Sequence, residues 1–185
     1  MLLEDRRQER LRLRQQRVHL WTCRERVVVQ WLHKAAAIPS VLALFALVSR
    51  VGDGIAWYAV MAGLPFTQAG WKVSAYMLAL GGVNLVFYKA LKLRTARPRP
   101  FVDCPDIKAC ARCLDEHSFP SGHTMHAVAF SMLLSHFYPA MEPVLWGFTS
   151  LVALSRVVLG LHYPSDVLAG AGIGAVTAMF FLVVV

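Results

Sequence analysis

The sequence predicts an all-α protein, a polytopic membrane bundle of about six transmembrane helices preceded by a basic amphipathic N-terminal helix. Hydrophobic residues make up 57% of the 185 positions, more than the roughly half that is usual in soluble domains. Neither repeats nor a linker divide the chain, so we expect one membrane-embedded domain over residues 35–185 after a segment at 1–34. Six stretches lack charged side chains: Ala35–Ser49, Gly54–Trp71, Val73–Tyr88, Ser118–Met141, Pro143–Ser155 and Val167–Val185.

These six stretches differ in how well each fits a membrane span. A spanning helix needs about 20 mostly apolar residues, and the third, fourth and sixth stretches meet this best. The first is short and contains Pro39, and the second is interrupted by Gly63, Pro65 and Gly70. We therefore expect the first two to be kinked, tilted or only partly inserted.

The N-terminal segment 1–34 carries much of the positive charge. Its nine cationic residues are Arg6, Arg7, Arg10, Arg12, Arg14, Arg17, Arg24, Arg26 and Lys34. The positive-inside rule places such a segment in the cytoplasm. Apolar residues at roughly helical spacing (Leu11, Val18, Trp21, Val28 and Leu32) favour a helix lying on anionic headgroups, and a solvated basic arm is the alternative. No groove-reading motif accompanies the charge, so no nucleic-acid partner is expected.

The long polar interruption at 89–117 contains the first of three polar islands, and the second follows it directly. The first is KLRTARPRP, from Lys92 to Pro100, in which four of nine residues are cationic and the prolines end the preceding helix. By itself this island would also fit a basic patch on lipid headgroups. The second is FPSGHTMHA, where Ser121 and Gly122 precede His123 at a helix N-terminus, a place where exposed amides bind anions. His126, three residues further on, is expected to be dispensable.

The third island, SRVVLGLHYPSD, puts charged residues into an apolar C-terminal third. Arg156 needs an anionic partner, because an unpaired arginine in hydrocarbon costs about 2.5–3.5 kcal/mol even on permissive scales. His162 and Asp166 are four residues apart around Pro164, so the carboxylate can reach the imidazole and raise the basicity of its other nitrogen. Taken alone, the island would also fit a charged helix cap at the membrane surface.

Alternating crossings bring the three islands to one membrane face. Cationic side chains can hold phosphate oxygens there, one histidine can attack phosphorus, and the other can protonate the leaving alkoxide. From the chemistry alone, the carboxylate of Asp166 favours His162 as the attacking histidine.

The order and spacing of these residues resemble the tripartite signature of the type 2 phosphatidic acid phosphatase superfamily. The matching parts are Lys92-x6-Arg99-Pro100, Pro120-Ser121-Gly122-His123 and Ser155-Arg156-x5-His162-x3-Asp166. The resemblance implies that His162 is the nucleophile and Asp166 orients it. It also implies that His123 is the general acid. The phosphoryl group would be bound by Lys92, Arg99, Ser121, Gly122 and Arg156.

This resemblance implies an integral membrane lipid phosphate phosphatase that uses no metal and no other cofactor. The expected partners are a phospholipid or prenyl phosphate substrate and membrane lipids. A lipid phosphotransferase, a vanadium haloperoxidase and a non-catalytic membrane binding protein are the alternatives. We expect the protein to lie in the bacterial cell membrane. Three crossings after residue 34 would place the site outside the cytoplasm. If only one of the first two stretches spans, the site faces the cytoplasm instead.

The loop at 101–119 adds a cysteine cluster to the signature. Cys104, Cys110 and Cys113 precede His117. Four such ligands could bind zinc tetrahedrally, whereas an oxidising compartment favours a disulfide with one cysteine left over. Either would fasten a short lid beside the site. Cys23, in the N-terminal segment, is expected to be a free thiol.

Overall fold

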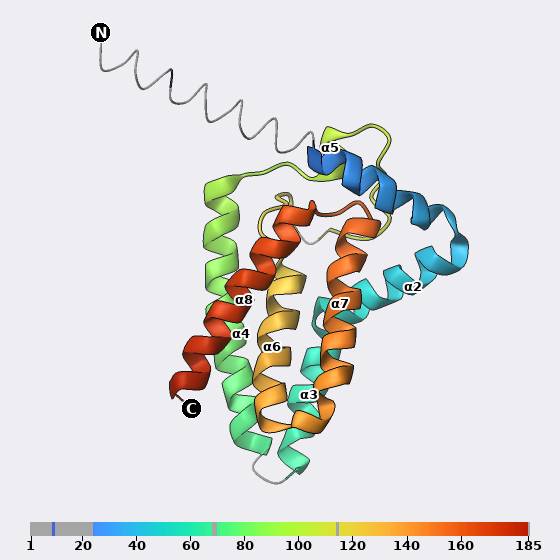
Figure 1. The fold of residues 1–185 in the computed structure, drawn as a ribbon. Coiled ribbons are helices and arrows are strands. Elements are labelled where there is room, and N and C mark those ends of the chain that lie inside the picture. Colours follow the sequence, from blue (N-terminus) through green and yellow to red (C-terminus); the bar gives the residue numbers. More distant parts are fainter. Residues whose placement is uncertain (1–8, 10–23, 68–69, 114, 185) are drawn as a thin grey trace.

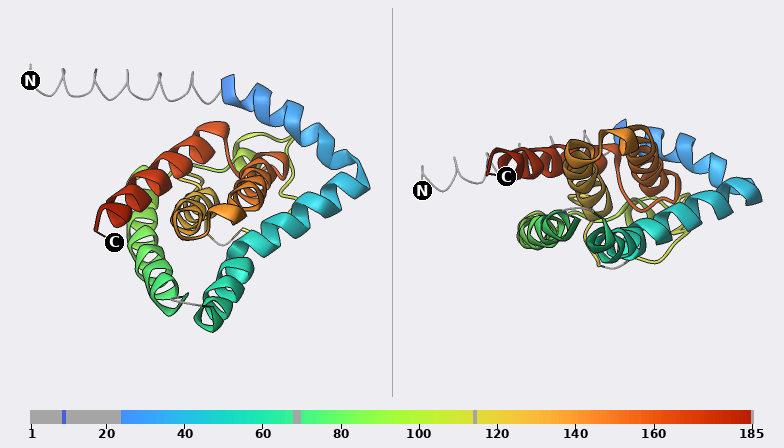
Figure 2. Two further views of the ribbon diagram at one scale, coloured as in Figure 1. Left: turned by 60° about the horizontal axis from the view of Figure 1, so that its bottom comes forward. Right: turned by 90° about the horizontal axis from the view of Figure 1, so that it is seen from below.

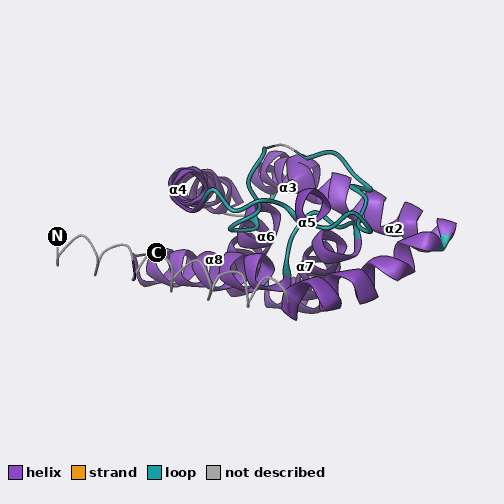
Figure 3. Cartoon of the chain, turned by 90° about the horizontal axis from the view of Figure 1, so that it is seen from above, coloured by secondary structure: helices purple, strands orange, loops and turns teal. Residues whose placement is uncertain are grey.

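The computed structural model describes residues 9, 24–67, 70–113 and 115–184, and the regular elements among them are all helical (Figures 1 and 3). This confirms the all-α prediction. The main helices are α2 (Pro39–Arg50), α3 (Ala56–Gly63), α4 (Gly70–Thr95), α6 (Gly122–Phe137), α7 (Glu142–Val158) and α8 (Pro164–Val184). The short elements are η1 (Lys34–Ala37), η2 (Val51–Ile55), η3 (Leu64–Phe66), α5 (Pro100–Asp103) and η4 (Pro139–Met141). A further helix covers residues 24–33.

Helix α6 forms the centre of the bundle. It contacts α4, α7 and α8, and Figure 2 shows it surrounded by these helices and α3. Ala127, Ala129 and Leu133 on α6 are fully buried. The ring of Phe130 packs 5.3 Å from that of Trp57 on α3. The helix that opens with the second polar island is therefore fixed from several sides.

Helices α6 and α8 approach each other closely because α8 carries glycines at the contact. A Cβ on Gly170 would lie 2.4 Å from the carbonyl oxygen of Ser121, and one on Gly174 would lie 2.3 Å from that of Met125. Small residues four apart allow such backbone contact between membrane helices. This contact holds the N-termini of the two helices, and the histidines near them, in a fixed relation.

The first two apolar stretches form one bent helix rather than two spans. Residues Pro39–Phe66 run continuously through α2, η2, α3 and η3 and are long and apolar enough to cross a membrane once. The bend lies at η2, a π-helix in which Gly54 has a φ of 122°. The expected kinking is present at Gly54, where the backbone leaves helical geometry, and the two stretches together form one candidate span instead of two.

The prediction of about six spans is confirmed only in part. Among the described residues, three helical segments are long and apolar enough to cross a membrane: Pro39–Phe66, Gly70–Asp103 and Pro164–Val183. Helices α6 and α7 have 16 and 17 residues, fewer than the roughly 20 of a full span. The fourth stretch, expected to be among the clearest spans, is instead the shorter, largely buried core helix α6.

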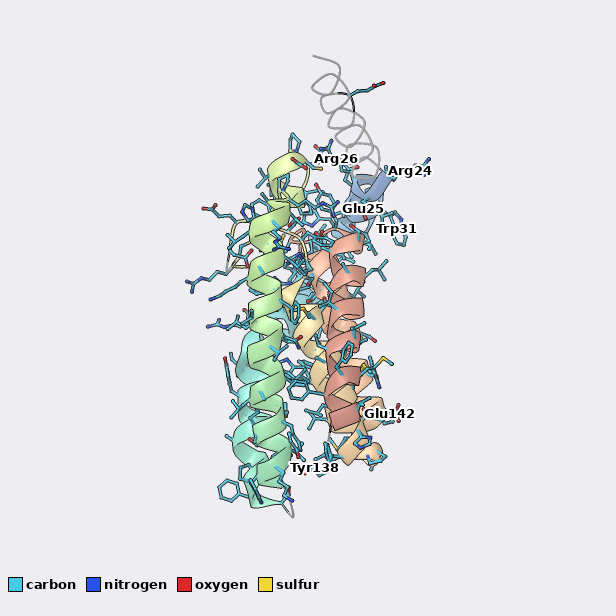
Figure 4. All side chains as sticks on the ribbon, turned by 90° about the vertical axis from the view of Figure 1, so that its left-hand side faces the viewer. Arg24, Glu25, Arg26, Trp31, Tyr138 and Glu142 are labelled. Atoms are coloured by element: carbon cyan, nitrogen blue, oxygen red, sulfur yellow. The ribbon has the colours of Figure 1, made fainter. Side chains whose placement is uncertain are left out.

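The helix at 24–33 packs on the end of the bundle where the polar islands meet. Glu25 pairs with Arg97, and the ring of His33 lies 2.9 Å from the carbonyl oxygen of Val158. Figure 4 places this helix at the end opposite Glu142, with Trp31 pointing away from the bundle. The N-terminal helix and the site therefore lie at the same end of the bundle, whereas the sequence-based expectation placed them on opposite membrane faces. Two candidate spans, Pro39–Phe66 and α4, separate them in the chain.

The amphipathic character predicted for 1–34 can be followed only in its last third, since Leu11, Val18 and Trp21 lie outside the described residues. In the helix at 24–33, Val29 is fully buried against the bundle, while Val27 and Trp31 are 66% and 69% exposed. The helix thus packs one face on the protein and offers the other to its surroundings.

Candidate active site

The three polar islands meet at one end of the bundle, as predicted. Lys92 comes from the last turns of α4, and Arg99 follows the chain reversal at Ala96, a non-glycine residue in the left-handed region with φ 45°. His123 lies in the first turn of α6, and Arg156 in the last turn of α7. His162 lies in the short connection to α8, which begins at Pro164. Figure 3 views this end and shows the connecting loops gathered over the helices.

The cations Lys92 and Arg99 converge on a carboxylate that sequence reasoning missed. Asp115 Oδ1 accepts hydrogen bonds from the Lys92 ammonium and, at 2.9 Å, from Arg99 Nη2. Tyr88 donates its hydroxyl to the other carboxylate oxygen at 2.5 Å. Burial alone would raise the pKa of Asp115, but the bonds from Lys92 and Tyr88 lower it to about 2. The carboxylate of Asp115 is therefore bound to two of the cations that are expected to bind phosphate.

His162 presents one nitrogen to these cations. Arg99 Nη1 lies 3.3 Å from His162 Nε2, and since a guanidinium can only donate, Nε2 carries the lone pair. Burial and the nearby Arg156, Arg99 and Lys92 charges lower the pKa of His162 well below its ordinary value. The imidazole is consequently neutral and its Nε2 is a potential nucleophile.

Asp166 lies beside His162 but does not hydrogen-bond to it. Its Oδ2 is 3.7 Å from His162 Nδ1 and accepts the backbone N–H of Tyr163 at 2.8 Å instead. Its Oδ1 accepts from Arg97 Nη1 at 2.7 Å. Nδ1 of His162 is buried without a hydrogen-bond partner among the described residues. The carboxylate therefore lies beside the neutral imidazole without forming the hydrogen bond predicted between them.

Arg97 is a second residue that sequence reasoning missed. Besides Asp166, its guanidinium pairs with Glu25 at 2.5 Å and lies 4.2 Å over the ring of Tyr163. Glu25 also accepts the backbone N–H of Ser165 at 3.1 Å. The helix at 24–33 is therefore connected through Arg97 to the carboxylate beside His162. The signal in the sequence was the extra arginine between Lys92 and Arg99.

The bent helix also contributes side chains to the site. His123 Nε2 contacts Asp53 Oδ1, and Arg156 Nη1 donates to Ser49 Oγ. Ser49 and Asp53 are four residues apart and so lie on one face of this helix. Arg156 is only 2% exposed, and among the described residues no acidic side chain forms the ion pair with it that the sequence led us to expect.

Ser121 and Gly122, in the turn before α6, were both expected to bind the phosphoryl group, but only Gly122 faces the cavity. Ser121 is fully buried and caps α6, its Oγ lying 3.0 Å from Thr124 Oγ1. Gly122 lines the cavity, and a Cβ there would lie 2.8 Å from the ring of Tyr88. His126 donates from Nδ1 to the carbonyl oxygen of Gly122 at 2.9 Å. In this structure Gly122 is placed to meet a ligand, whereas the Ser121 hydroxyl is used within the fold.

The cysteine cluster does not form the predicted zinc site or a Cys110–Cys113 disulfide. Cys110 and Cys113 are free thiols, and the described residues include no group of three or more His, Cys, Asp or Glu side chains placed to bind a metal. Cys104 is buried in the same small cluster as Val29 and Tyr163. The loop is held by packing and by the bonds of Asp115.

A cavity of about 340 Å³ joins the polar groups to an apolar slot. At its polar end it is lined by Asp53, Lys92, Arg99, Asp115, His123, Arg156 and His162. Its apolar part lies between α3 and α4 and is lined by Trp57, Tyr58, Met61, Met77, Leu78, Gly81, Gly82 and Leu85. A polar headgroup and the start of an apolar chain could occupy the two parts together.

Comparison with known proteins identifies the family. The sequence profile of the PAP2 superfamily matches residues 69–185, which include all three polar islands. The chain belongs to the PAP2 superfamily. The resemblance noted from the signature is thereby confirmed.

Two relatives illustrate the match. The decaprenylphosphoryl-5-phosphoribose phosphatase of Mycobacterium tuberculosis is 30% identical over 142 residues, covering 74% of this chain and 76% of the relative. Phosphatidylglycerophosphatase B of Bacillus subtilis is 32% identical over 133 residues, covering 66% of this chain and 61% of the relative.

Two crystal structures share the fold. LpxE of Aquifex aeolicus superposes with a TM-score of 0.75 at 24% identity, covering 84% of this chain and 92% of that protein. A PAP2-type phosphatidylglycerolphosphate phosphatase of Bacillus subtilis gives a TM-score of 0.68 at 24% identity, covering 85% and 84%. The chain therefore has the helical fold of these membrane proteins.

Proposed function

We propose that this PAP2-family lipid phosphate phosphatase hydrolyses the phosphomonoester or diphosphate of a membrane lipid through a phosphohistidine at His162. The observation that carries the proposal is the position of His162 Nε2, 3.3 Å from Arg99 Nη1 in a cavity also lined by Lys92 and Arg156. A phosphoryl group bound by these cations lies next to the lone pair of Nε2.

In the proposed reaction, Nε2 of His162 attacks phosphorus and the bond from phosphorus to the lipid oxygen breaks. His123 gives a proton to the departing oxygen, and Asp166 stabilises the charge that develops on His162. Water then attacks the phosphohistidine, giving up a proton to His123 and releasing phosphate. Lys92, Arg99, Arg156 and the Gly122 amide bind the transferred group, while Ser121 holds the turn that carries Gly122.

The cavity and the names of the relatives support a lipid phosphate as the substrate. The apolar slot between α3 and α4 fits the first part of a lipid chain while the phosphate reaches the cations. The relatives' names include phosphatases of decaprenylphosphoryl-5-phosphoribose, phosphatidylglycerophosphate and lipid A. We accordingly propose a prenyl phosphate or diphosphate, phosphatidic acid, or a phosphatidylglycerophosphate-type lipid as substrate.

We further propose that the site faces the cytoplasm. The exterior location expected from the sequence required three crossings between residue 34 and Lys92, whereas Pro39–Phe66 and α4 provide two. The site then shares the compartment of the helix at 24–33, whose basic residues favour the cytoplasmic side.

A panel of these lipids, assayed in detergent for phosphate release by the purified protein, tests the proposal. We expect one class to be hydrolysed, and both His162→Ala and His123→Ala to lower turnover by about 10²-fold or more while the proteins stay folded. Appearance of the label on a second lipid instead of free phosphate would indicate the phosphotransferase alternative. A folded wild type that releases no phosphate from any of these lipids would contradict the proposal.

A further inference from the structure

Asp53 brings a carboxylate into the active-site cavity from a helix that carries none of the family signature. Its Oδ1 contacts Nε2 of His123, and it lines the same cavity as His162 and Arg156. We propose that Asp53 is a positioning residue that acts through His123 and makes this histidine an effective proton donor. The inference rests on the proposed phosphatase function and deepens it.

The local backbone is built to present this side chain. Asp53 lies in η2, which joins α2 to α3 at a kink, and the next residue, Gly54, leaves the helical region with a φ of 122°. Gly54 is required here, because a side chain with this φ would be strained and its Cβ would lie 2.8 Å from the ring of Tyr58.

The charge itself also indicates a function. Between Val51 and Trp71, Asp53 is the only acidic or basic residue, and it lies within the apolar segment Pro39–Phe66. A carboxylate in such a segment is costly unless it is paired, and intramembrane ionisable residues usually mark functional positions. The partner that the structure gives it is His123.

The pairing assigns the two nitrogens of His123. A carboxylate can only accept, so Nε2 of His123 carries its proton toward Asp53. Nδ1 is then the nitrogen that exchanges a proton with the substrate. Burial lowers the pKa of His123, and the contact with Asp53 opposes this shift by favouring the imidazolium form, in which both nitrogens are protonated.

His123 gives up one proton when the phosphohistidine forms and regains one when it is hydrolysed. As the bond from phosphorus to the lipid oxygen breaks, the Nδ1 proton passes to that oxygen and His123 becomes neutral. Asp53 stays ionised and keeps accepting the Nε2 proton. When water attacks the phosphohistidine, Nδ1 takes a proton from the water, which restores the imidazolium.

Leaving-group dependence tests the role of Asp53 directly. An alkyl leaving group needs a proton, whereas p-nitrophenolate departs without one. We expect Asp53→Asn to lower kcat about 10- to 100-fold on a lipid phosphate and by less than about threefold on p-nitrophenyl phosphate. Asp106→Asn, the same change at an exposed loop aspartate, should match the wild type on both substrates.

A double variant tests whether Asp53 affects catalysis through His123 or independently of it. Adding Asp53→Asn to His123→Ala should cause no further loss on the lipid phosphate, because the group through which Asp53 acts is already absent. Losses that multiply in the double variant would overturn the proposal. Equal losses on the two substrates would also overturn it, because they indicate a structural role.

A third variant covers the case in which Asp53→Asn does not fold. Asp53→Glu keeps the charge. We expect its loss of kcat on the lipid phosphate to exceed its loss on p-nitrophenyl phosphate by a smaller factor than in His123→Ala. A difference as large as that of His123→Ala would contradict the role of the carboxylate. An inactive wild type would overturn the proposed function together with this inference, whereas an active wild type with equal losses overturns this inference alone.

Discussion

At the residue scale, the main feature of the site is a carboxylate bound where a phosphate is expected. Asp115 holds Lys92 and Arg99 together, so a phosphoryl group bound by these cations must compete with it. The same contacts compensate two buried cations, which reduces the cost of burying them. Asp115 therefore both stabilises the site and competes with an anionic ligand.

Removing the charge of Asp115 should strengthen anion binding. For Asp115→Asn we expect inhibition by orthovanadate at an about 10-fold lower concentration, since the competing carboxylate is gone. The measurement is the inhibition constant against a hydrolysed lipid phosphate. Glu116→Gln, the neighbouring exposed acid, is the matched control and should behave as the wild type. Weaker vanadate inhibition of Asp115→Asn would show that Asp115 positions the cations rather than competing.

The cations also lead to a prediction about metal. Lys92, Arg99 and Arg156 supply the positive charge that a two-metal phosphatase takes from its ions. We therefore expect EDTA to leave phosphate release unchanged, measured on desalted protein with and without added magnesium. A loss on chelation that magnesium restores would contradict this.

The sequence predicted the signature residues well and their partners poorly. Lys92, Arg99, His123, Arg156 and His162 could be placed together because short connections after alternating helices bring their ends to one face. The partners Asp53, Asp115 and Arg97 could not be found, because each depends on how a bent helix or an irregular loop packs. The hydroxyl of Ser121 was assigned to substrate, but it caps α6, since a buried helix N-terminus needs an acceptor for its N–H groups.

At the element scale, the contact between α6 and α8 determines the spacing of the catalytic groups. Gly174→Ala should force the helices apart, because the new Cβ would lie 2.3 Å from the carbonyl oxygen of Met125. We expect a lower melting temperature in detergent, by several degrees, and at least a 10-fold loss of activity. Gly172→Ala is the control, since a Cβ there meets no atom within 4 Å.

Similar losses for Gly172→Ala and Gly174→Ala would mean that the helix packing is not responsible for the loss of activity.

At the element scale, the sequence correctly predicted one helix end: α3 ends at Gly63, where the second apolar stretch is interrupted. It misled at Arg50–Gly54, where charged and glycine residues were taken to separate two spans. There the chain bends at Gly54 within one candidate span, and Asp53 beside the bend pairs with His123.

At the scale of the whole molecule, the fold places the N-terminal helix and the site at one end of the bundle, which predicts that they lie on the same side of the membrane. The test is labelling by a membrane-impermeant thiol reagent, with single cysteines in a protein whose other cysteines are replaced. Native Cys113 reports the site, Arg24→Cys the N-terminal helix, and Ala140→Cys the opposite end. We expect the first two to label from the same side and the third from the other.

The charge rule further predicts that only Ala140→Cys labels in intact cells. Labelling of Cys113 in intact cells together with Arg24→Cys would reverse the proposed orientation and leave the fold unchanged. Labelling of Cys113 and Arg24→Cys from different sides would contradict the fold itself.

The central claim is that the phosphoryl group passes through His162, and trapping the intermediate tests it most directly. The protein is mixed with a radiolabelled lipid phosphate that it hydrolyses, quenched under alkaline conditions in which phosphohistidine survives, digested and mapped by mass spectrometry. We predict phosphate on His162 in the wild type and none in His162→Ala. Phosphate on another residue, or turnover retained by His162→Ala, would contradict the account.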